Sequence, residues 1–176
     1  GQMSPSDTLL VMASGAGAPL AGEDLAAFAR GLRAVCRWAA LLIVKDGEGA
    51  EFVVRLVVDG AADPGEAEAV GRAIADSPLV RTAVHGRDPN WGRVSQAVGQ
   101  ALAGRGGPPA TLAIAADGVS IDDPAVAEVM ARPEYALGGS LGRGDARAGP
   151  FFCDPGHASI TPVPFTPLRA HATVLE

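Results

Sequence analysis

The chain has 176 residues, of which 48% are hydrophobic, 19% charged and 5% aromatic, and its formal net charge is −6 at pH 7. This composition is typical of a soluble globular protein with one folding unit, or part of one, and it excludes a largely disordered chain. Because an acidic chain with an isoelectric point near 5.0 has no large basic field to attract phosphates, we expect no nucleic-acid partner.

The first half of the chain predicts two strands and two helices. Residues 7–14 (DTLLVMAS) form a short apolar run that ends at glycines, which predicts a buried strand and then a loop. Residues 51–60 (EFVVRLVVDG) are nearly apolar on both faces, as in a central strand covered on both sides. Residues 63–78 begin with Asp-Pro and end with Pro, which delimits a capped helix. A long amphipathic helix is predicted between the two strands, with a buried side made of Leu25, Phe28, Leu32, Val35, Ala39 and Leu42.

The second half of the chain also predicts both helices and strands. Residues 93–104 (RVSQAVGQALAG) carry apolar side chains on one side, which predicts a helix opened by the turn at 88–92. Residues 111–121 predict two strands around an Asp-Gly hairpin turn, and residues 122–133 predict a short capped helix. From Gly138 onward, glycines and prolines separate short pieces that we interpret as edge strands. The mixture favours an α+β layered sandwich, and the lack of a G-x-G-x-x-G motif after a strand disfavours a Rossmann unit.

The sequence also bears on membrane insertion and on the cellular compartment of the protein. No apolar run reaches the roughly 18–20 residues that a membrane-spanning helix needs, so we expect no membrane partner. The first residues, GQMSPSDT, lack the basic region and apolar core of a signal peptide, and Cys36 and Cys153 make a poor disulfide framework. These features favour a cytoplasmic location.

Few residues indicate a nucleophile or a metal site. Cys153 closely precedes His157, but proximity in sequence says little about a catalytic pair. The histidines His85, His157 and His171 are scattered and lack the recurring spacing of zinc ligands, so we expect no metal ion and no cofactor. We interpret His85 as a hydrogen-bonded structural residue.

Glu48 has a more suggestive setting. It lies in KDGEGA, directly after the predicted long helix, with a glycine on either side. Glycine permits unusual φ values and close approach of the backbone, so the Glu48 carboxylate could be held at the mouth of a site and bind an ammonium group. The alternative is a plain helix-terminating loop with an exposed acid, and spacing alone does not decide between them.

The most polar stretch of the chain is HGRDPNWGRV. Pro89 fixes its own φ and Asn90 tolerates turn geometry, which predicts a rigid bend. Trp91 is expected to bury surface area, Asp88 and Asn90 to bond backbone groups at the start of the next helix, and Arg93 to pair with a carboxylate. The stretch is either a structural corner or a wall that shapes a pocket.

Residues 77–99 (SPLVRTAVHGRDPNWGRVSQAVG) closely resemble the signature of the ornithine acetyltransferase family, the bifunctional glutamate N-acetyltransferases. SDTLLVMASG, KDGEGA and LGRGDA lie around it in the order of the family. The resemblance covers about residues 4–157. It implies an N-terminal-nucleophile-like α/β/β/α sandwich related to the DmpA aminopeptidases.

The resemblance also implies a mechanism and partners. In the family a precursor cleaves itself, and the new N-terminal threonine of the second chain takes acetyl from N-acetylornithine and passes it to glutamate, with an oxyanion hole from the first chain. The substrates are thus an N-acyl amino acid and an amino acid, without a cofactor. Because this sequence starts at Gly1, we expect no catalytic residue in it and an N-terminal, alpha-like chain or segment that carries the nucleophile.

Four positions bear on the pocket that the family builds. Glu48 matches the family's substrate-binding acid, whereas Glu51 and Phe52 stand where threonine and lysine are usual. Val163 stands where we align an asparagine that holds the substrate. Residues 1–160 are therefore expected to be the ornithine-acetyltransferase-like beta-chain region, and 161–176 a divergent C-terminal tail.

Three functions follow as hypotheses. The chain is part of an acyltransferase in which Glu48 holds the substrate amine and the scaffold is Asp88, Asn90, Trp91 and Arg93. Alternatively it is a degenerate, non-catalytic subunit or binding module, or it serves acyl transfer in secondary metabolism or amide hydrolysis. The altered tail favours the last two over a housekeeping arginine enzyme.

Overall fold

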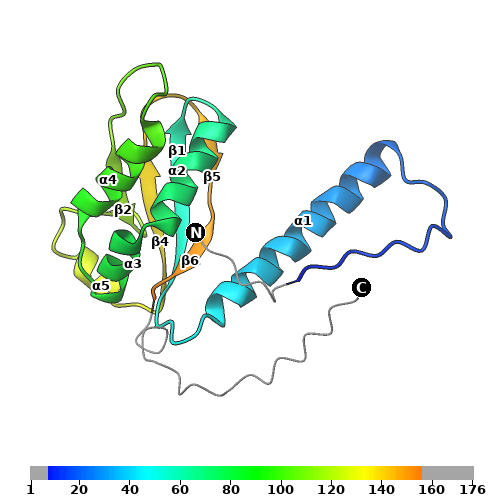
Figure 1. Ribbon diagram of the computed structural model, residues 1–176, viewed down its shortest axis with the longest axis horizontal. Coiled ribbons are helices and arrows are strands. Elements are labelled where there is room, and N and C mark those ends of the chain that lie inside the picture. The colour runs from blue at the N-terminus through cyan, green and yellow to red at the C-terminus, as the bar shows by residue number, and fades with distance from the viewer. Residues whose placement is uncertain (1–7, 156–176) are drawn as a thin grey trace, which may run out of the picture.

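A single mixed sheet organises the computed structural model, which describes residues 8–155 (Figure 1). The strands follow the order β3-β2-β4-β1-β5, and β6 also pairs with β1. β1 and β4 are parallel, and the other pairs are antiparallel. The elements are α1 (Gly22–Lys45), β1 (Val53–Ala61), α2 (Pro64–Asp76), α3 (Pro78–His85), α4 (Trp91–Leu102), β2 (Ala113–Ala116), β3 (Val119–Ser120), α5 (Val126–Met130), β4 (Glu134–Ser140), β5 (Ala146–Ala148) and β6 (Phe151–Cys153). The α+β expectation is confirmed.

β1 has neighbours on both edges but is buried mainly on one face. Val54, Leu56 and Val58 are fully buried and belong to the main core, and each such side chain contributes about 1.5–3 kcal/mol relative to an exposed one. The alternate residues Arg55 and Asp59 are exposed or half-buried. The expectation of cover on both faces is therefore wrong for β1 within the described residues, because its second face carries these two charged side chains.

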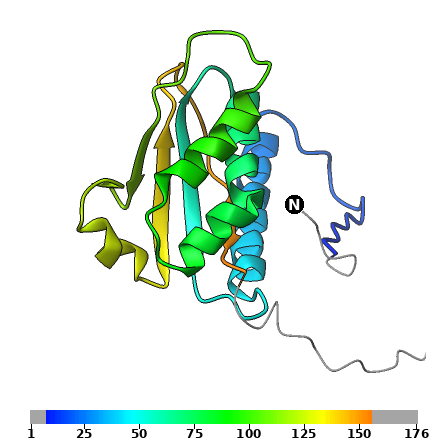
Figure 2. The ribbon, with the colours of Figure 1, turned by 60° about the vertical axis from the view of Figure 1, so that its left-hand side comes forward.

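Three helices, α2, α3 and α4, lie together on one side of the sheet (Figure 2). Each starts at a side-chain cap: Asp63 accepts a hydrogen bond from the Glu66 N–H, Ser77 from the Val80 N–H, and Asn90 from the Arg93 N–H. The predicted helices after Asp63 and after the 88–92 turn are confirmed. α3 was not predicted, since Pro78 had been interpreted as a stop and is in fact the first residue of a new helix.

The N-terminal part differs most from the prediction. Residues 8–14 form no strand, and Leu9–Met12 are 63–84% exposed. A strand is stable only with a paired neighbour, and no described strand pairs with this segment. α1 is a helix as predicted, but none of its residues is buried and it projects away from the sheet (Figure 1).

The C-terminal strands close the sheet. The hairpin between β2 and β3 turns at Asp117 (φ 44) and Gly118 (φ 83), the two left-handed positions of a type I′ turn. β5 and β6 pair with β1 as edge strands, as predicted. The short helix predicted over residues 122–133 is confirmed as α5, but it has no side-chain cap at its start, contrary to the prediction. β4 was not predicted, although it lies between β1 and β2.

Candidate functional site

Glu48 lies at the tip of a tight turn between α1 and β1. The Ala50 N–H donates to the Gly47 carbonyl at 2.9 Å, and Gly49 has φ 71, a left-handed conformation that suits glycine. Gly47 approaches Cys153 of β6 so closely that a side chain at residue 47 would overlap the Cys153 Sγ. Gly49 has the unusual φ and Gly47 makes the close approach that the sequence allowed for. Glu48 itself is exposed, as the alternative of a plain helix-terminating loop expects, and its role as the acid of a site stays a prediction.

Asp154 fixes the backbone on the C-terminal side of this turn. Its Oδ1 accepts hydrogen bonds from the Glu51 N–H at 2.9 Å and from the Phe52 N–H at 2.8 Å. The Asp154 residue is only 2% exposed. A buried carboxylate is stable only when its oxygens are paired, and here the pairing ties the end of β6 to the start of β1.

His85, the last residue of α3, completes the pairing of Asp154. The distance from His85 Nδ1 to Asp154 Oδ2 is 2.7 Å. Because an ionised carboxylate can only accept, Nδ1 is assigned the proton and donates. Burial raises the pKa of Asp154, but the hydrogen bonds from the Phe52 N–H, from His85 and from the Glu51 N–H outweigh it, so the pKa lies below its usual value. The interpretation of His85 as a hydrogen-bonded structural residue is confirmed.

Arg87 makes a second contact from the same stretch. Its guanidinium carbon lies 5.2 Å from the centroid of the Phe52 ring, within the range of a cation–π interaction. Arg87 reaches this place with φ 53, which is unfavourable for a side chain other than glycine. His85 and Arg87 thus converge on the anchor that Phe52 and Asp154 form beside the Glu48 turn.

The predicted corner at residues 88–93 joins α3 to α4. Asn90 caps α4, and the Asp88 Oδ2 accepts from the Asn90 Nδ2 at 3.0 Å. Three expectations are wrong. The Asp88 side chain bonds the Asn90 side chain and not a backbone group at the start of α4. Trp91 is 58% exposed, and Arg93 donates to the Leu79 carbonyl at 2.9 Å instead of pairing with a carboxylate. For Trp91 and Arg93, the bend turns the side chain outward or back toward α3.

The structure does not bring the corner and Glu48 into direct contact. No hydrogen bond or ion pair links 88–93 to Glu48 within residues 8–155. Trp91 instead lines an open groove of about 540 Å³, whose other lining residues are Ser95, Leu112, Ala113, Ile114, Ser120, Ile121 and Asp122.

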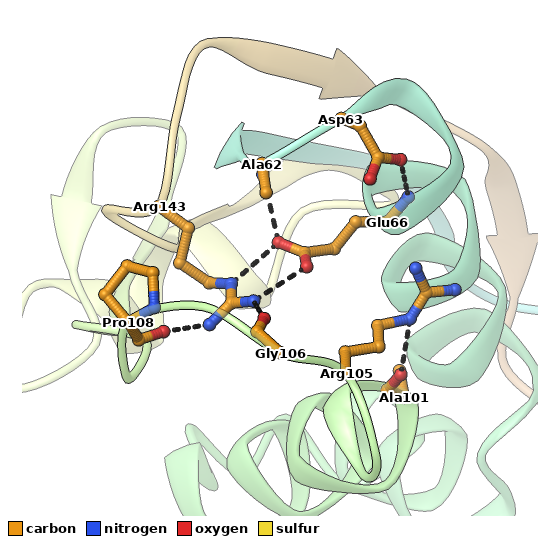
Figure 3. Close-up of polar contacts among 8 residues, drawn as sticks. All are labelled: Ala62, Asp63, Glu66, Ala101, Arg105, Gly106, Pro108 and Arg143. Atoms are coloured by element: carbon orange, nitrogen blue, oxygen red, sulfur yellow. Dashed lines mark hydrogen bonds and ion pairs between the residues drawn. The ribbon is translucent and has the colours of Figure 1, made fainter.

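A buried ion pair locks the opposite end of β1 (Figure 3). Arg143, between β4 and β5, donates from Nε and Nη2 to the two carboxylate oxygens of Glu66 on α2, at 2.9 and 3.0 Å. The Glu66 Oε1 also accepts from the Ala62 N–H at 3.0 Å. Hydrogen bonds from Arg143 and from Ala62 lower the pKa of Glu66 despite the opposing effect of burial.

Arg143 is fully committed to this structural role. Its Nη2 also donates to the Gly106 carbonyl at 2.7 Å, and its Nη1 donates to the Pro108 carbonyl (Figure 3). All three guanidinium nitrogens are occupied, so Arg143 is not available to a ligand. Sequence reasoning singled out LGRGDA only for its resemblance, and the paired Glu66 had no local signal.

Cys153 is not activated as a nucleophile. Burial raises the pKa of its thiol, an effect that Arg81 opposes and Asp154 reinforces. His157, His171, Val163 and the expected tail boundary lie outside the described residues. Within residues 8–155, no group of three or more metal-ligating side chains is placed to hold an ion. The helices described in this part of the chain are too short or too polar to cross a membrane.

Comparison with known proteins gives consistent matches. The sequence model of the ArgJ family matches residues 1–161. The arginine biosynthesis bifunctional protein ArgJ of Bradyrhizobium diazoefficiens is 38% identical over 175 residues, covering 88% of this chain and 41% of that protein. The protein of the same name from Chlorobaculum tepidum is 39% identical over 171 residues, with 91% and 42% covered. The chain therefore spans about two fifths of the length of these relatives.

A solved structure shares the fold. The crystal structure of the arginine biosynthesis bifunctional protein ArgJ from Bacillus halodurans superposes with a TM-score of 0.76 at 31% sequence identity. The match covers 90% of this chain and 80% of that one. This similarity agrees with the α+β fold class expected from the sequence.

Proposed function

The chain belongs to the ArgJ family, and from this premise we propose that it is part of an acetyltransferase that moves an acetyl group between N-acetylornithine, or a related N-acyl amino acid, and glutamate. In this proposal the chain contributes the carboxylate of Glu48, which binds the substrate amine. The observation that carries this proposal is the Glu48 turn, whose two glycines and buried Asp154 anchor hold an exposed carboxylate on a fixed backbone.

The attacking group comes from another segment. In the first step a hydroxyl oxygen attacks the acetyl carbonyl of the donor, the carbon–nitrogen bond breaks, and the released amine takes the hydroxyl proton. In the second step the amine of glutamate attacks the resulting ester, the carbon–oxygen bond breaks, and the hydroxyl regains a proton. In the first step Glu48 holds the free ammonium group of N-acetylornithine without joining the covalent chemistry. In the second step the glutamate amine attacks in its uncharged form, and the proton that it loses goes to the departing hydroxyl oxygen.

Exposed apolar surface supports a partner segment that carries this hydroxyl. Leu9–Met12 are exposed, as are the α1 side chains Leu25, Phe28, Val35 and Trp38. A patch of this kind marks an interaction surface. We propose that it is covered by the alpha-like segment, separated by autocatalytic cleavage, in a hetero-oligomer. The free thiols of Cys36 and Cys153 fit a reducing cytoplasm.

The corner at 88–93 acts as scaffold in this proposal. It sets the end of α3 against the start of α4, and α3 carries His85 to the anchor of the Glu48 turn.

The test compares Glu48→Gln with Glu128→Gln in the full natural polypeptide, including the segment with the nucleophile. Glu128 is a matched control because it is an exposed acid on α5, outside the Glu48 turn. Loss of a charged hydrogen bond to an ammonium group costs about 1.5–3 kcal/mol, so Glu48→Gln should weaken binding of the amine substrate by about tenfold or more, and Glu128→Gln should not.

Intact mass spectrometry supplies the second arm. Incubation with N-acetylornithine should add one acetyl group to the wild-type segment that carries the nucleophile. No acetyl adduct in the wild-type protein would contradict the acetyl-transfer proposal and favour a non-catalytic homologue. Unchanged substrate affinity in Glu48→Gln would remove Glu48 from the site.

A further inference from the structure

A continuous series of contacts runs from α3 to the Glu48 turn. It starts at the His85 imidazole, passes through both carboxylate oxygens of Asp154, and ends at the N–H groups of Glu51 and Phe52. The residues are far apart in sequence, so the contacts depend on the folded arrangement of α3, β1 and β6.

We propose that His85 and Asp154 are positioning residues for Glu48, which fix the backbone of its turn so that the carboxylate meets the substrate amine in one orientation. The proposal rests on the proposed function, in which Glu48 binds that amine. Neither residue needs to touch the substrate.

Both sides of the turn are held. On the N-terminal side, the Asp46 N–H donates to the Leu42 carbonyl at 2.9 Å, and Lys45 forms a 2.7 Å ion pair with Glu134. On the C-terminal side, the two bonds to Asp154 are the anchor. Residues 47–50 lie between these supports, and Glu48 is the charged side chain among them, with the exposed acids Asp46 and Glu51 on either side.

The anchor is more elaborate than a surface loop requires. A carboxylate is buried beneath the loop although burial of a charge is unfavourable. Arg87 holds a left-handed conformation while it covers the Phe52 ring. Unfavourable features of this kind persist where the surrounding structure enforces them, and they gather at functional sites. Two such features converge on the residues that follow Glu48, which points to a need for a fixed backbone there.

The first experiment changes Asp154 to Asn in the full natural polypeptide and measures three quantities. Hydrogen exchange at the Glu51 and Phe52 amides should become faster. The KM for the amine substrate should rise by about five- to tenfold, while kcat changes by about twofold or less, because an orienting contact made in the ground state is weakened. Asp63→Asn is the control.

Asp63 is a suitable control because it also accepts a backbone N–H with its carboxylate, at the far end of β1. The 9 residues of β1 separate the two sites by about 30 Å. Asparagine is an equally good helix cap, so Asp63→Asn should change neither the amide exchange of the loop nor the KM.

A double-mutant cycle tests whether the effect passes through Glu48. In a Glu48→Gln background, Asp154→Asn should raise the KM no further, since the group to be positioned is gone. The KM of His85→Asn should stay close to the wild-type value, because the side-chain N–H of the asparagine can still donate to Asp154. The KM of His85→Ala should rise. If Asp154→Asn does not fold, the pair of His85 variants carries the same test.

Two results would overturn the positioning role. One is an unchanged KM in Asp154→Asn despite faster exchange at Glu51 and Phe52. The other is an additive effect of Asp154→Asn in the Glu48→Gln background. If instead Glu48→Gln alone leaves the KM unchanged, the proposed function of Glu48 fails, and that outcome is distinct from both.

Discussion

Gly47 packs directly against Cys153: a β-carbon at residue 47 would lie 2.9 Å from the Cys153 Sγ and 3.2 Å from the Val44 carbonyl oxygen. The contact joins the end of α1 to β6 beside the Glu48 turn. It therefore links the stability of the turn to a residue pair that can be altered without touching any charged group.

Gly47→Ala should destabilise the protein by about 1–3 kcal/mol through overpacking. Cys153→Ala in the same chain should restore part of the loss, because the sulfur that clashes is removed. Gly31→Ala is the control: Gly31 lies within α1 with open space around it, and alanine there should stabilise the helix by about 0.5–1 kcal/mol. Urea unfolding measures all of these, and equal stability of Gly47→Ala and wild type would contradict the close packing.

Arg143→Met should strongly lower the free energy of unfolding, because it leaves the Glu66 carboxylate buried without its cationic partner. Replacing both residues, as Glu66→Met with Arg143→Met, should give a chain more stable than the Arg143→Met variant. Urea midpoints compare the single and double variants. Additive losses would show that the pair is not coupled.

Acid should destabilise the fold through Asp154 and Glu66. Both carboxyl groups have a folded-state pKa below their ordinary values of 3.8 and 4.5. Their contribution to stability is therefore fully present above the ordinary values and is lost as the pH falls through the lowered folded-state values. The free energy of unfolding, measured by urea titration from pH 7 to pH 3, should decline below about pH 4.5.

The matching variants separate this effect from general acid sensitivity. Asp154→Asn should reduce the slope of stability against pH in the acid range. Gly31→Ala removes no titrating group, so it should shift the whole curve without changing its shape. An unchanged slope in Asp154→Asn would contradict the assigned pKa shift.

Trp91→Ser should change the free energy of unfolding by less than about 0.5 kcal/mol, because the indole is largely exposed. Thermal unfolding checks this expectation. The same variant tests whether the corner at 88–93 is purely structural or also forms the wall of a pocket. Weaker substrate binding with intact stability would assign the groove beside Trp91 to the substrate.

The sequence predicted the elements whose ends are marked locally. Asp63 and Asn90 cap their helices by contacts within a few residues, and the Asp-Gly turn at residue 117 needs only its own backbone. The Glu48 turn was likewise identified by its glycines. Such signals depend only on neighbouring residues in the sequence, so they can be recognised without the tertiary structure.

The missed features depend on distant partners. β4 contains Gly138 and Gly139, which weaken strand propensity, yet it is held between β1 and β2. Asp154 bonds the Glu51 N–H across 103 positions. The apolar run at 8–14 was interpreted as a buried strand because hydrophobicity indicates a tendency to be covered but does not identify the segment that covers it.

The fixed backbone around Glu48 has a consequence for the energetics of recognition. Where a loop must fold over its ligand, part of the interaction energy is spent on ordering many torsions. Here the turn is already ordered, so substrate arrival would restrict little beyond the torsions of one glutamate side chain, at a cost of about 0.5–1.5 kcal/mol. If Glu48 binds the amine as proposed, preorganisation of this kind would make the affinity depend mainly on the charge of Glu48 and little on the mobility of the loop.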